Sequence, residues 1–416
     1  MPLDPRTPVL VGAGAVQQRE EYPRRGREPI ELMLAALRRA AVDAGDASLL
    51  ARADSIRVPR GFWDYSDPGR LLGERLGATR ARSQLAEIGV LQTTLFGGAV
   101  EAIASGAADV VLVAGGEAKF RALRAQVSGI EAPATAQRDV EPDETLRPAR
   151  EIWGPLEESL GLLMPVTQFA MIENALRHAA GTSVAAHRAE LARLWADFSR
   201  VAAANPAAWD REPHDEAALR GGDARNRLLA FPYAKLHNSQ WNVDQAAGLI
   251  FTSVATARAA GIDERRWVFP LAVAESNHMV PLSERAEVHR SHGFRLAGAR
   301  ALEHAELAIG AVAHLELYSC FPAAVRVQTR ELGIDAGRPL TESGGMAFAG
   351  GPLNNFVLQA LVRMVEVLRA DAGSSGLVSA VSGMLTKQGV SLWSTRPPRR
   401  PCAWLDVSDA VAAATR

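Results

Sequence analysis

Short apolar runs alternate with amphipathic stretches over residues 1–118. In residues 28–45 the apolar side chains recur at helical spacing, which predicts an amphipathic helix. The run DVVLVAG at 109–115 is continuously apolar, as is typical of a strand covered on both faces. Similar patterns predict strands at 8–16 and 54–60 and helices at 70–78 and 93–106. This alternation predicts an α/β fold with a mainly parallel sheet and covering helices.

The alternation stops between about residues 119 and 235. This part is rich in Arg, Glu, Pro and Ala, and residues 184–206 have a helical pattern. Residues 128–150 are polar and interrupted by prolines, which predicts an irregular segment. We interpret this part as a helical insertion.

The alternation of strands and helices returns after residue 236. The patterns predict a helix at 243–261, a strand at 267–276, a helix at 296–307, an apolar run at 312–322 and a closing strand at 373–385. The chain is therefore divided into an N-terminal half (1–118), an insertion domain (119–235) and a C-terminal half (236–416).

Each half contains a helix that follows a loop and leads into an apolar strand. If the halves pack about a pseudo-dyad, the N-termini of the two helices converge. Helix N-termini carry unpaired N–H groups and a positive dipole end, which suit an oxyanion or a thiolate. In the second half the turn Gly350-Gly351-Pro352 precedes the helix, and Asn354 or Asn355 is placed to cap it.

Composition and charge favour a cytoplasmic protein that does not bind nucleic acid. The formal net charge is −1, so no overall field attracts nucleic acid. Two cysteines, Cys320 and Cys402, cannot build a disulfide framework, and no segment approaches the roughly 20 apolar residues of a membrane span. The stretch VGAGAVQ has Gln17 where a dinucleotide fingerprint needs its third glycine. With no cluster at metal-ligand spacing, we expect no metal and no tightly bound cofactor.

Several segments, in this order along the chain, carry a resemblance to the thiolase superfamily. They are VLVGAGAVQQRE (9–20), IASGAADVVLVAGGEA (103–118), FPYAKLHNSQWNVDQAAGLIFTS (231–253), LELYSCFPAAV (315–325) and SGGMAFAGGPLNNFVLQALV (343–362). The chain resembles most closely the sterol-carrier-protein-type, acetyl-CoA acetyltransferase-like branch. The resemblance implies two similar βαβαβ halves in a five-layer αβαβα core with an insertion (loop) domain. It also implies a homodimer paired through sheet edges and an acyl-CoA ligand.

The catalytic positions that the resemblance implies are substituted here. The nucleophilic cysteine position falls near Gly89, the histidine of the Gly-His-Pro turn is Gly351, and the late cysteine position falls near Ala380. Acyl transfer without these groups lacks its nucleophile, its activating base and its proton carrier. Ordinary thiolysis is therefore expected to be lost.

Three other side chains are candidates for catalysis. Tyr318 stands where the resemblance places the histidine of a His-Asp-Cys-Phe motif, and its phenol could exchange a proton with substrate. Cys320, on the same side of a regular strand, could be a relocated nucleophile, and His237 precedes a segment that lines the CoA channel in thiolases. Structural roles stay open for all three: a tyrosine bonded to backbone, a small buried hydrophobe and, for His237, a place beside a helix entry at 242–248.

Further positions are candidates for contact with CoA or substrate. Asn238 and Gln240 match family positions along the channel, Trp241 could pack against pantetheine or adenine, and His278 follows an apolar strand. The turn Gly350-Gly351-Pro352 completes the set. Helix entry is the structural alternative for the segment at 242–248, and a satisfied loop position is the alternative for His278.

Three functions remain compatible with the sequence. The first is an acyl-CoA acyltransferase of the thiolase family. The second is an aldolase or carbon–carbon lyase on a β-hydroxyacyl-CoA, such as a steroid side chain, with Tyr318 as the acid/base group. The third is a non-catalytic acyl-CoA-binding or scaffolding subunit. An OB-fold-type module, which relatives carry or pair with, would have to come from a separate partner protein.

Overall fold

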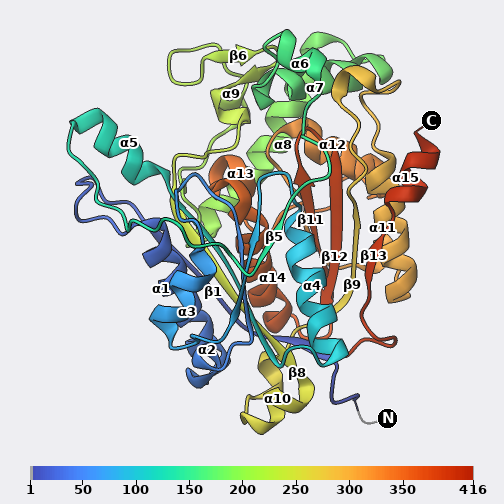
Figure 1. Ribbon diagram of the computed structural model, residues 1–416. Helices are drawn as coiled ribbons and strands as arrows, with labels where there is room; N and C mark the ends of the chain where they lie inside the picture. Colours follow the sequence, from blue (N-terminus) through green and yellow to red (C-terminus); the bar gives the residue numbers. More distant parts are fainter. Residues whose placement is uncertain (1–2, 416) are drawn as a thin grey trace.

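The computed structural model describes residues 3–415 and contains two large β-sheets that face each other (Figure 1). The first sheet has the order β1-β8-β4-β2-β3-β5, and the second has the order β10-β11-β12-β9-β13. The strands of the first sheet are β1 (Pro8–Gln18), β2 (Ser55–Pro59), β3 (Arg82–Ala86), β4 (Val110–Ala118), β5 (Glu144–Leu146) and β8 (Asp244–Ser253). Those of the second are β9 (Phe269–Ser276), β10 (His314–Glu316), β11 (Ser375–Ser382), β12 (Lys387–Ser394) and β13 (Trp404–Asp406).

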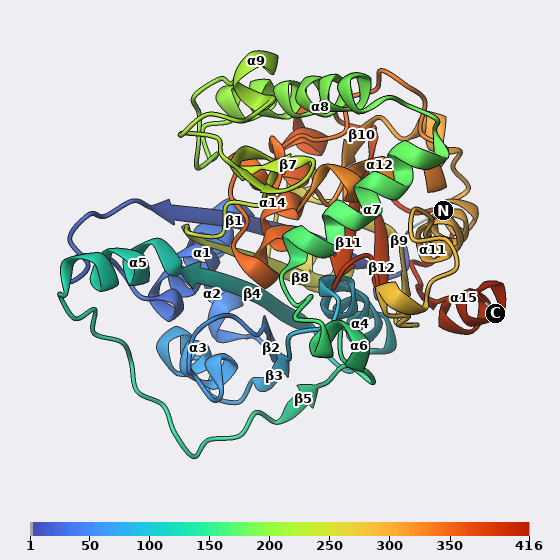
Figure 2. The same ribbon diagram turned by 90° about the horizontal axis from the view of Figure 1, so that it is seen from above.

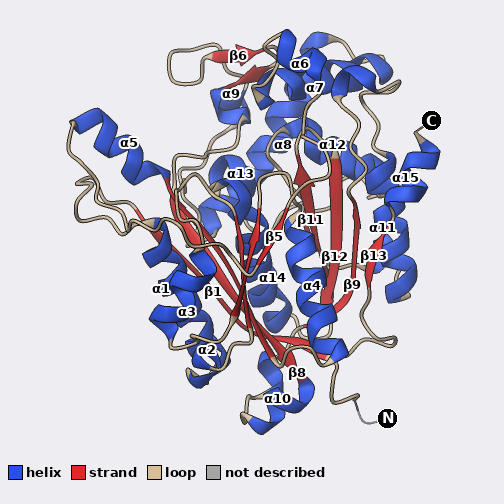
Figure 3. Ribbon diagram, viewed as in Figure 1, coloured by secondary structure: helices blue, strands red, loops and turns tan. Residues whose placement is uncertain are grey.

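Helices form three layers around and between these sheets, which gives the predicted five-layer αβαβα architecture (Figure 3). The central layer is α4 (Gln92–Ser105) and α14 (Phe356–Ala370), which contact both sheets. Helices packed on the first sheet are α1 (Pro29–Ala44), α3 (Pro68–Leu76) and α10 (Val254–Ala259), with α2 (Ser48–Ala51) beside α1. On the second sheet lie α11 (His292–Ala305) and α15 (Ser408–Ala414). No helix within residues 3–415 is long and apolar enough to cross a bilayer.

Close approach of the sheets to α4 depends on two glycines. A Cβ added at Gly97 would lie 2.4 Å from the ring of Trp404 on β13, and one at Gly98 would lie 2.3 Å from Arg57 Nη1 on β2. A side chain at either position would push a sheet away from the helix. The sequence FGGA inside an otherwise apolar helix therefore fixes the spacing of the central layer.

The insertion lies mainly over the end of the second sheet, and its first helix, α5, extends beside the first sheet (Figures 1 and 2). Its helices are α5 (Lys119–Ser128), α6 (Pro155–Ser159), α7 (Pro165–Ala179), α8 (Val184–Ala204) and α9 (Glu216–Leu219), followed by the hairpin β6 (Leu228–Ala230) and β7 (Tyr233–Ala234). Other short elements are α12 (Pro322–Glu331), α13 (Gly345–Phe348), η1 (Lys235–His237), η2 (Glu264–Arg266), η3 (Leu282–Glu284), η4 (Ile309–Ala311) and η5 (Leu353–Asn355). Residues 129–143 are irregular, as predicted, and then form β5 at the edge of the first sheet.

Three predictions about the second part of the chain were wrong. Residues 243–261 are not one helix: β8 is a fully buried strand between β1 and β4, so the chain returns to the first sheet after the insertion. The strand at 373–385 does not close the fold, because β12, β13 and α15 follow it. The strand expected in the apolar run at 312–322 ends at Glu316. Tyr318 and Cys320 therefore lie in an irregular segment, and the alternation of sides along a strand does not place them on the same side.

Candidate functional site

The N-termini of the two central helices meet, as predicted from the repeated helix–strand pattern. Gln92 Nε2, in the first turn of α4, donates to Asn354 Oδ1 at 3.3 Å, just before α14. Asn354 Nδ2 in turn donates to the Arg60 carbonyl at 2.7 Å. The predicted side-chain cap is absent: Asn354 bridges two segments, and the buried Asn355 amide has no hydrogen-bond partner among residues 3–415.

Gly89, near which the resemblance places the nucleophilic cysteine, is covered. Its backbone has a φ of 101°, and an added Cβ would lie 3.0 Å from Pro148 Cγ and 3.6 Å from Ile152 Cγ2. From the other side the buried Lys387 Nζ donates to the Gly89 carbonyl at 2.7 Å. Burial lowers the pKa of the Lys387 ammonium. A side chain at residue 89 thus faces both backbone strain and the insertion segment around Pro148.

At Gly351, where the resemblance places the histidine of the turn, the side-chain space is filled by a neighbour. An added Cβ there would lie 1.9 Å from Ser239 Oγ. The Gly351 N–H donates to the Gln240 carbonyl at 2.8 Å, so this N–H of the turn is not free to hold an oxyanion, contrary to our expectation. Ser239 N–H donates to the Cys320 carbonyl at 3.1 Å. Residues 238–241 therefore connect the glycine turn to the segment that carries Tyr318 and Cys320.

Tyr318 is the sequence-predicted residue whose chemistry the structure leaves available. Its half-buried ring packs edge-on against Phe356, with centroids 5.8 Å apart, at the start of α14. Its backbone is fixed by Ser379 Oγ and Gln328 Nε2, each at 2.8 Å. The phenol hydroxyl has no hydrogen-bond partner within residues 3–415. Burial raises the pKa of Tyr318 well above its usual range, so the group is a proton donor at neutral pH.

Cys320 and His237 are less suited to the roles considered for them. Burial raises the pKa of the Cys320 thiol well above its usual range, so the thiolate needed for attack is scarce. His237 is also buried, which lowers its pKa to about 4 and keeps the ring neutral. Its Nδ1 accepts the Ala234 N–H at 3.1 Å, which assigns the proton to Nε2. His237 is therefore a neutral donor.

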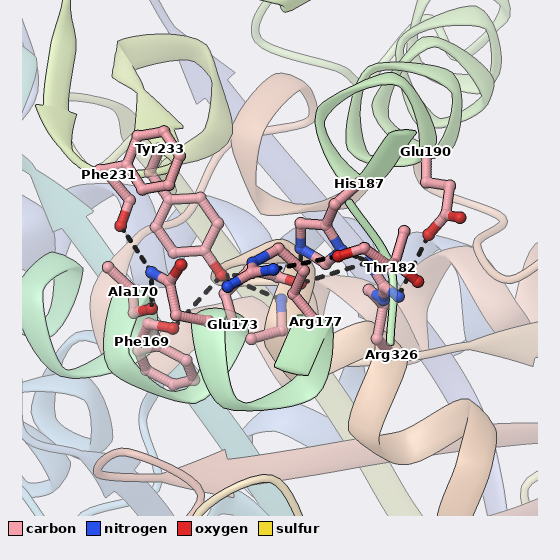
Figure 4. A network of polar contacts seen from close by, with 12 residues as sticks. Phe169, Ala170, Glu173, Arg177, Thr182, His187, Glu190, Phe231, Tyr233 and Arg326 are labelled. Atoms are coloured by element: carbon pink, nitrogen blue, oxygen red, sulfur yellow. Dashed lines mark hydrogen bonds and ion pairs between the residues drawn. The ribbon is translucent and has the colours of Figure 1, made fainter. Parts of the chain in front are cut away.

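A buried polar network beside this segment was not predicted (Figure 4). The Tyr233 hydroxyl donates to Glu173 Oε2 at 2.8 Å and accepts the Ala323 N–H at 3.2 Å. Glu173 lies 3.0 Å from His187 and 3.4 Å from Arg326. Because these residues come from α7, α8, β7 and α12, the network fixes the insertion above residues 320–323. The sequence does not show that these residues lie close together, so it could not have identified the network.

Trp241 is exposed at the rim of this region together with two residues that the sequence did not single out. Its ring lies 5.9 Å from that of Phe62, and Lys119 Nζ lies 4.0 Å from each ring centroid. Large exposed aromatic faces with a cation suit the base and phosphates of a nucleotide. The predicted residue His278 lies elsewhere, 3.3 Å from Thr415 Oγ1 in the wall of a separate cavity.

Comparison with known proteins identifies the family. A scan against protein-family models and a search of curated proteins give no match. A solved SCP2-thiolase-like protein of type 1 (STLP1) from Mycobacterium smegmatis, described as monomeric, is 30% identical with a TM-score of 0.77. The alignment covers 96% of this chain and 80% of that one. This chain belongs to the SCP2-thiolase-like proteins.

Two more distant structures share the thiolase-like fold. The Ltp2-ChsH2(DUF35) aldolase is 18% identical with a TM-score of 0.70, over 94% of this chain and 99% of that one. An acetyl-CoA acetyltransferase from Syntrophomonas wolfei is 19% identical with a TM-score of 0.63, over the same shares. This thiolase-like chain therefore has the fold of proteins with different named activities, so the fold alone does not assign its reaction.

Proposed function

We propose that this thiolase-like protein binds a CoA thioester and cleaves or forms a carbon–carbon bond in it, with Tyr318 as the proton donor. The observation that supports this best is the contrast between two sets of positions. The Tyr318 hydroxyl is unpaired and protonated, whereas Gly89 is covered by Pro148 and Gly351 is packed against Ser239. The side chains that acyl transfer needs are absent, and neighbours occupy their positions. The phenol that general-acid catalysis needs is present and has room.

The reaction class follows from what a phenol can supply. In the cleavage direction a β-hydroxyacyl thioester gives its hydroxyl proton to a water molecule, the Cα–Cβ bond breaks, and the electron pair moves into the thioester enolate. Tyr318 then gives a proton to Cα, and the released hydroxyl proton restores the phenol. The products are a carbonyl compound and a shortened acyl-CoA, with no net oxidation. General acid catalysis of this kind typically contributes about 10²–10⁴-fold to a rate.

One feature supports the CoA part of the proposal, and one comparison supports a partner protein. The cluster of Phe62, Lys119 and Trp241 offers aromatic faces and a positive charge beside residues 238–240, which contact the glycine turn. The aldolase with the same fold is named together with a DUF35 protein. We extend this to a proposal that a separate partner protein, of the OB-fold type, completes the present chain.

A non-catalytic CoA-binding subunit is the second candidate. The packing of Pro148 and Ile152 over Gly89 favours it, because this packing covers the position near which the resemblance to thiolases places the nucleophilic cysteine. The two candidates agree on ligand binding and differ only in turnover.

The test combines calorimetry with product analysis by mass spectrometry. The wild type, Tyr318→Phe and the control Tyr22→Phe, at an exposed tyrosine, are titrated with CoA and a β-hydroxyacyl-CoA. We expect binding to all three and a turnover at least about 100-fold lower in Tyr318→Phe alone. Binding without turnover in the wild type, with and without a DUF35-type partner, would establish the binding subunit. Absence of binding to any CoA species would overturn both candidates.

A further inference from the structure

A cavity of about 260 Å³ lies on the side of β12 opposite to Gly89. Thr386 and Gln388 line it, whereas Lys387 between them points to the Gly89 carbonyl. The remaining walls are the segment around Arg285, the N-terminus of α11 and one face of α15. The mechanism proposed above uses none of these residues.

The cavity has a half-buried arginine in its wall that forms no ion pair within the described chain, although the exposed Glu284 and Glu287 also line the cavity. Arg285 donates from Nε to the Val280 carbonyl at 3.1 Å and from Nη2 to the Met384 carbonyl at 2.9 Å. Among residues 3–415 no carboxylate lies within 4.0 Å of its guanidinium. The neighbouring Arg290 differs, because Glu331 neutralises it at 2.5 Å. Burial lowers the pKa of Arg285 to about 10, and the charge of Glu157 offsets only part of this effect.

The N-terminus of α11 adds hydrogen-bond donors to the same wall. Ser291 Oγ accepts the Phe294 N–H at 3.4 Å, which satisfies one of the first amides of this helix. His292 and Gly293 also line the cavity, and their N–H groups have no acceptor among the described residues. Unpaired amides at a helix start favour an anion.

Gln388 is a second and independent sign of a ligand. Its side chain is 4% exposed, and Nε2 donates to the Leu385 carbonyl at 2.7 Å. Oε1 has no hydrogen-bond partner in the described part of the chain and lies against Gly293, where an added Cβ would be only 1.7 Å away. A buried amide oxygen without a donor is costly, so it calls for a hydroxyl from a bound molecule.

The opposite wall is apolar and comes from Val280, Leu385, Val411 and Ala414. Inorganic phosphate would leave this wall uncovered. A short carbon chain would cover it while its carboxylate met Arg285 and the start of α11.

We propose that this cavity is a binding site for a short aliphatic hydroxycarboxylic acid in its carboxylate form. The carboxylate lies between Arg285 and the N–H groups of His292 and Gly293. The ligand hydroxyl donates to Gln388 Oε1, and the carbon chain packs on Val411 and Ala414. The site is independent of CoA binding, because it shares no residue with the Tyr318 region.

Calorimetry without CoA tests the site. The wild type is titrated with 3-hydroxybutyrate, butyrate and inorganic phosphate, together with two arginine variants. Arg285→Met is expected to lower the affinity for 3-hydroxybutyrate by about tenfold or more. Its matched control is Arg338→Met, because Arg338 also donates to two backbone carbonyls, those of Ile309 and Val312, but lies outside the cavity.

A second variant keeps the test valid if Arg285→Met does not fold. Ala414→Trp, at an exposed position on α15, fills the mouth of the cavity and is expected to abolish binding without unfolding the chain. Butyrate should bind more weakly than 3-hydroxybutyrate, because it cannot reach Gln388 Oε1 with a donor. Failure of the folded wild type to bind either acid overturns the proposal. So does phosphate binding as tight as that of the acids, or binding that survives both Arg285→Met and Ala414→Trp.

Discussion

The packing around Gly351 leaves no room for the histidine side chain that thiolysis needs. At Gly351 the side-chain space belongs to Ser239, whose Oγ would be 1.9 Å from an added Cβ. Gly351→His is therefore expected to lower the free energy of unfolding by about 1–3 kcal/mol through overpacking, without any gain of thiolysis. Urea denaturation measures the first effect, and an acetoacetyl-CoA thiolysis assay measures the second.

The control for this substitution is Gly310→His. A Cβ at residue 310 meets no atom within 4 Å, so this variant should stay within about 0.5 kcal/mol of the wild type. If Gly351→His were as stable as the wild type, Ser239 would have to move aside easily, and the histidine position would be vacant rather than filled.

The sequence could identify positions in the site but not the neighbours that occupy them. The glycine at position 351 of the turn and the phenol at Tyr318 could both be identified from motifs. That Ser239 fills the first position and Pro148 covers Gly89 depends on residues more than fifty positions away in the chain. The burial of Cys320 and His237 could not be predicted either. Their residue types suggested catalysis, but burial keeps the Cys320 thiol protonated and the His237 imidazole neutral.

At the scale of elements, the contact between α4 and α14 depends on one side chain. Asn354 accepts from Gln92 and donates to the Arg60 carbonyl, so it joins both helix starts to the first sheet. Asn354→Ala removes both bonds and is expected to lower the free energy of unfolding by about 1–2 kcal/mol. Chemical denaturation compares it with Gln359→Ala, a half-buried position on the same helix. Equal effects of the two substitutions would show that the bridge adds nothing.

Element type was predicted well where periodicity was strong, and it failed where burial overrode it. The helices α1, α4 and α8 and the strand β4 were all predicted from their patterns. The stretch DQAAGLIFTS was predicted to be helical as part of residues 243–261. It is a strand because it lies between β1 and β4, buried along its whole length, and small residues let α1 pack closely on it. A central strand of this kind has no alternation to reveal it.

At the scale of the whole molecule, the sheet edges bear on the predicted homodimer. The outermost strands β5, β10 and β13 each contain three residues, and short edge strands disfavour pairing between chains. The long edge strand β1 is protected by side chains. Asp43 accepts the Ala13 N–H at 2.9 Å, and Arg39 donates to the Ala15 carbonyl at 2.7 Å.

Access to the β1 edge is restricted further by the helices beside it. A cavity of about 540 Å³ runs along β1 and is lined by residues of both α1 and α14. The expectation of a dimer paired through sheet edges therefore finds no support in the arrangement of the strands, and the relative from Mycobacterium smegmatis is itself described as monomeric.

We therefore predict that the isolated chain sediments as a monomer. Analytical ultracentrifugation over a range of protein concentrations should give the mass of one chain throughout. Arg39→Ala frees the Ala15 carbonyl at the edge of β1 and is the variant in which self-association, if the edge protection matters, should first appear. A wild-type dimer that persists on dilution would mean that the chain pairs through a surface other than these four edges. A separate partner protein would then have to bind that dimer rather than the single chain.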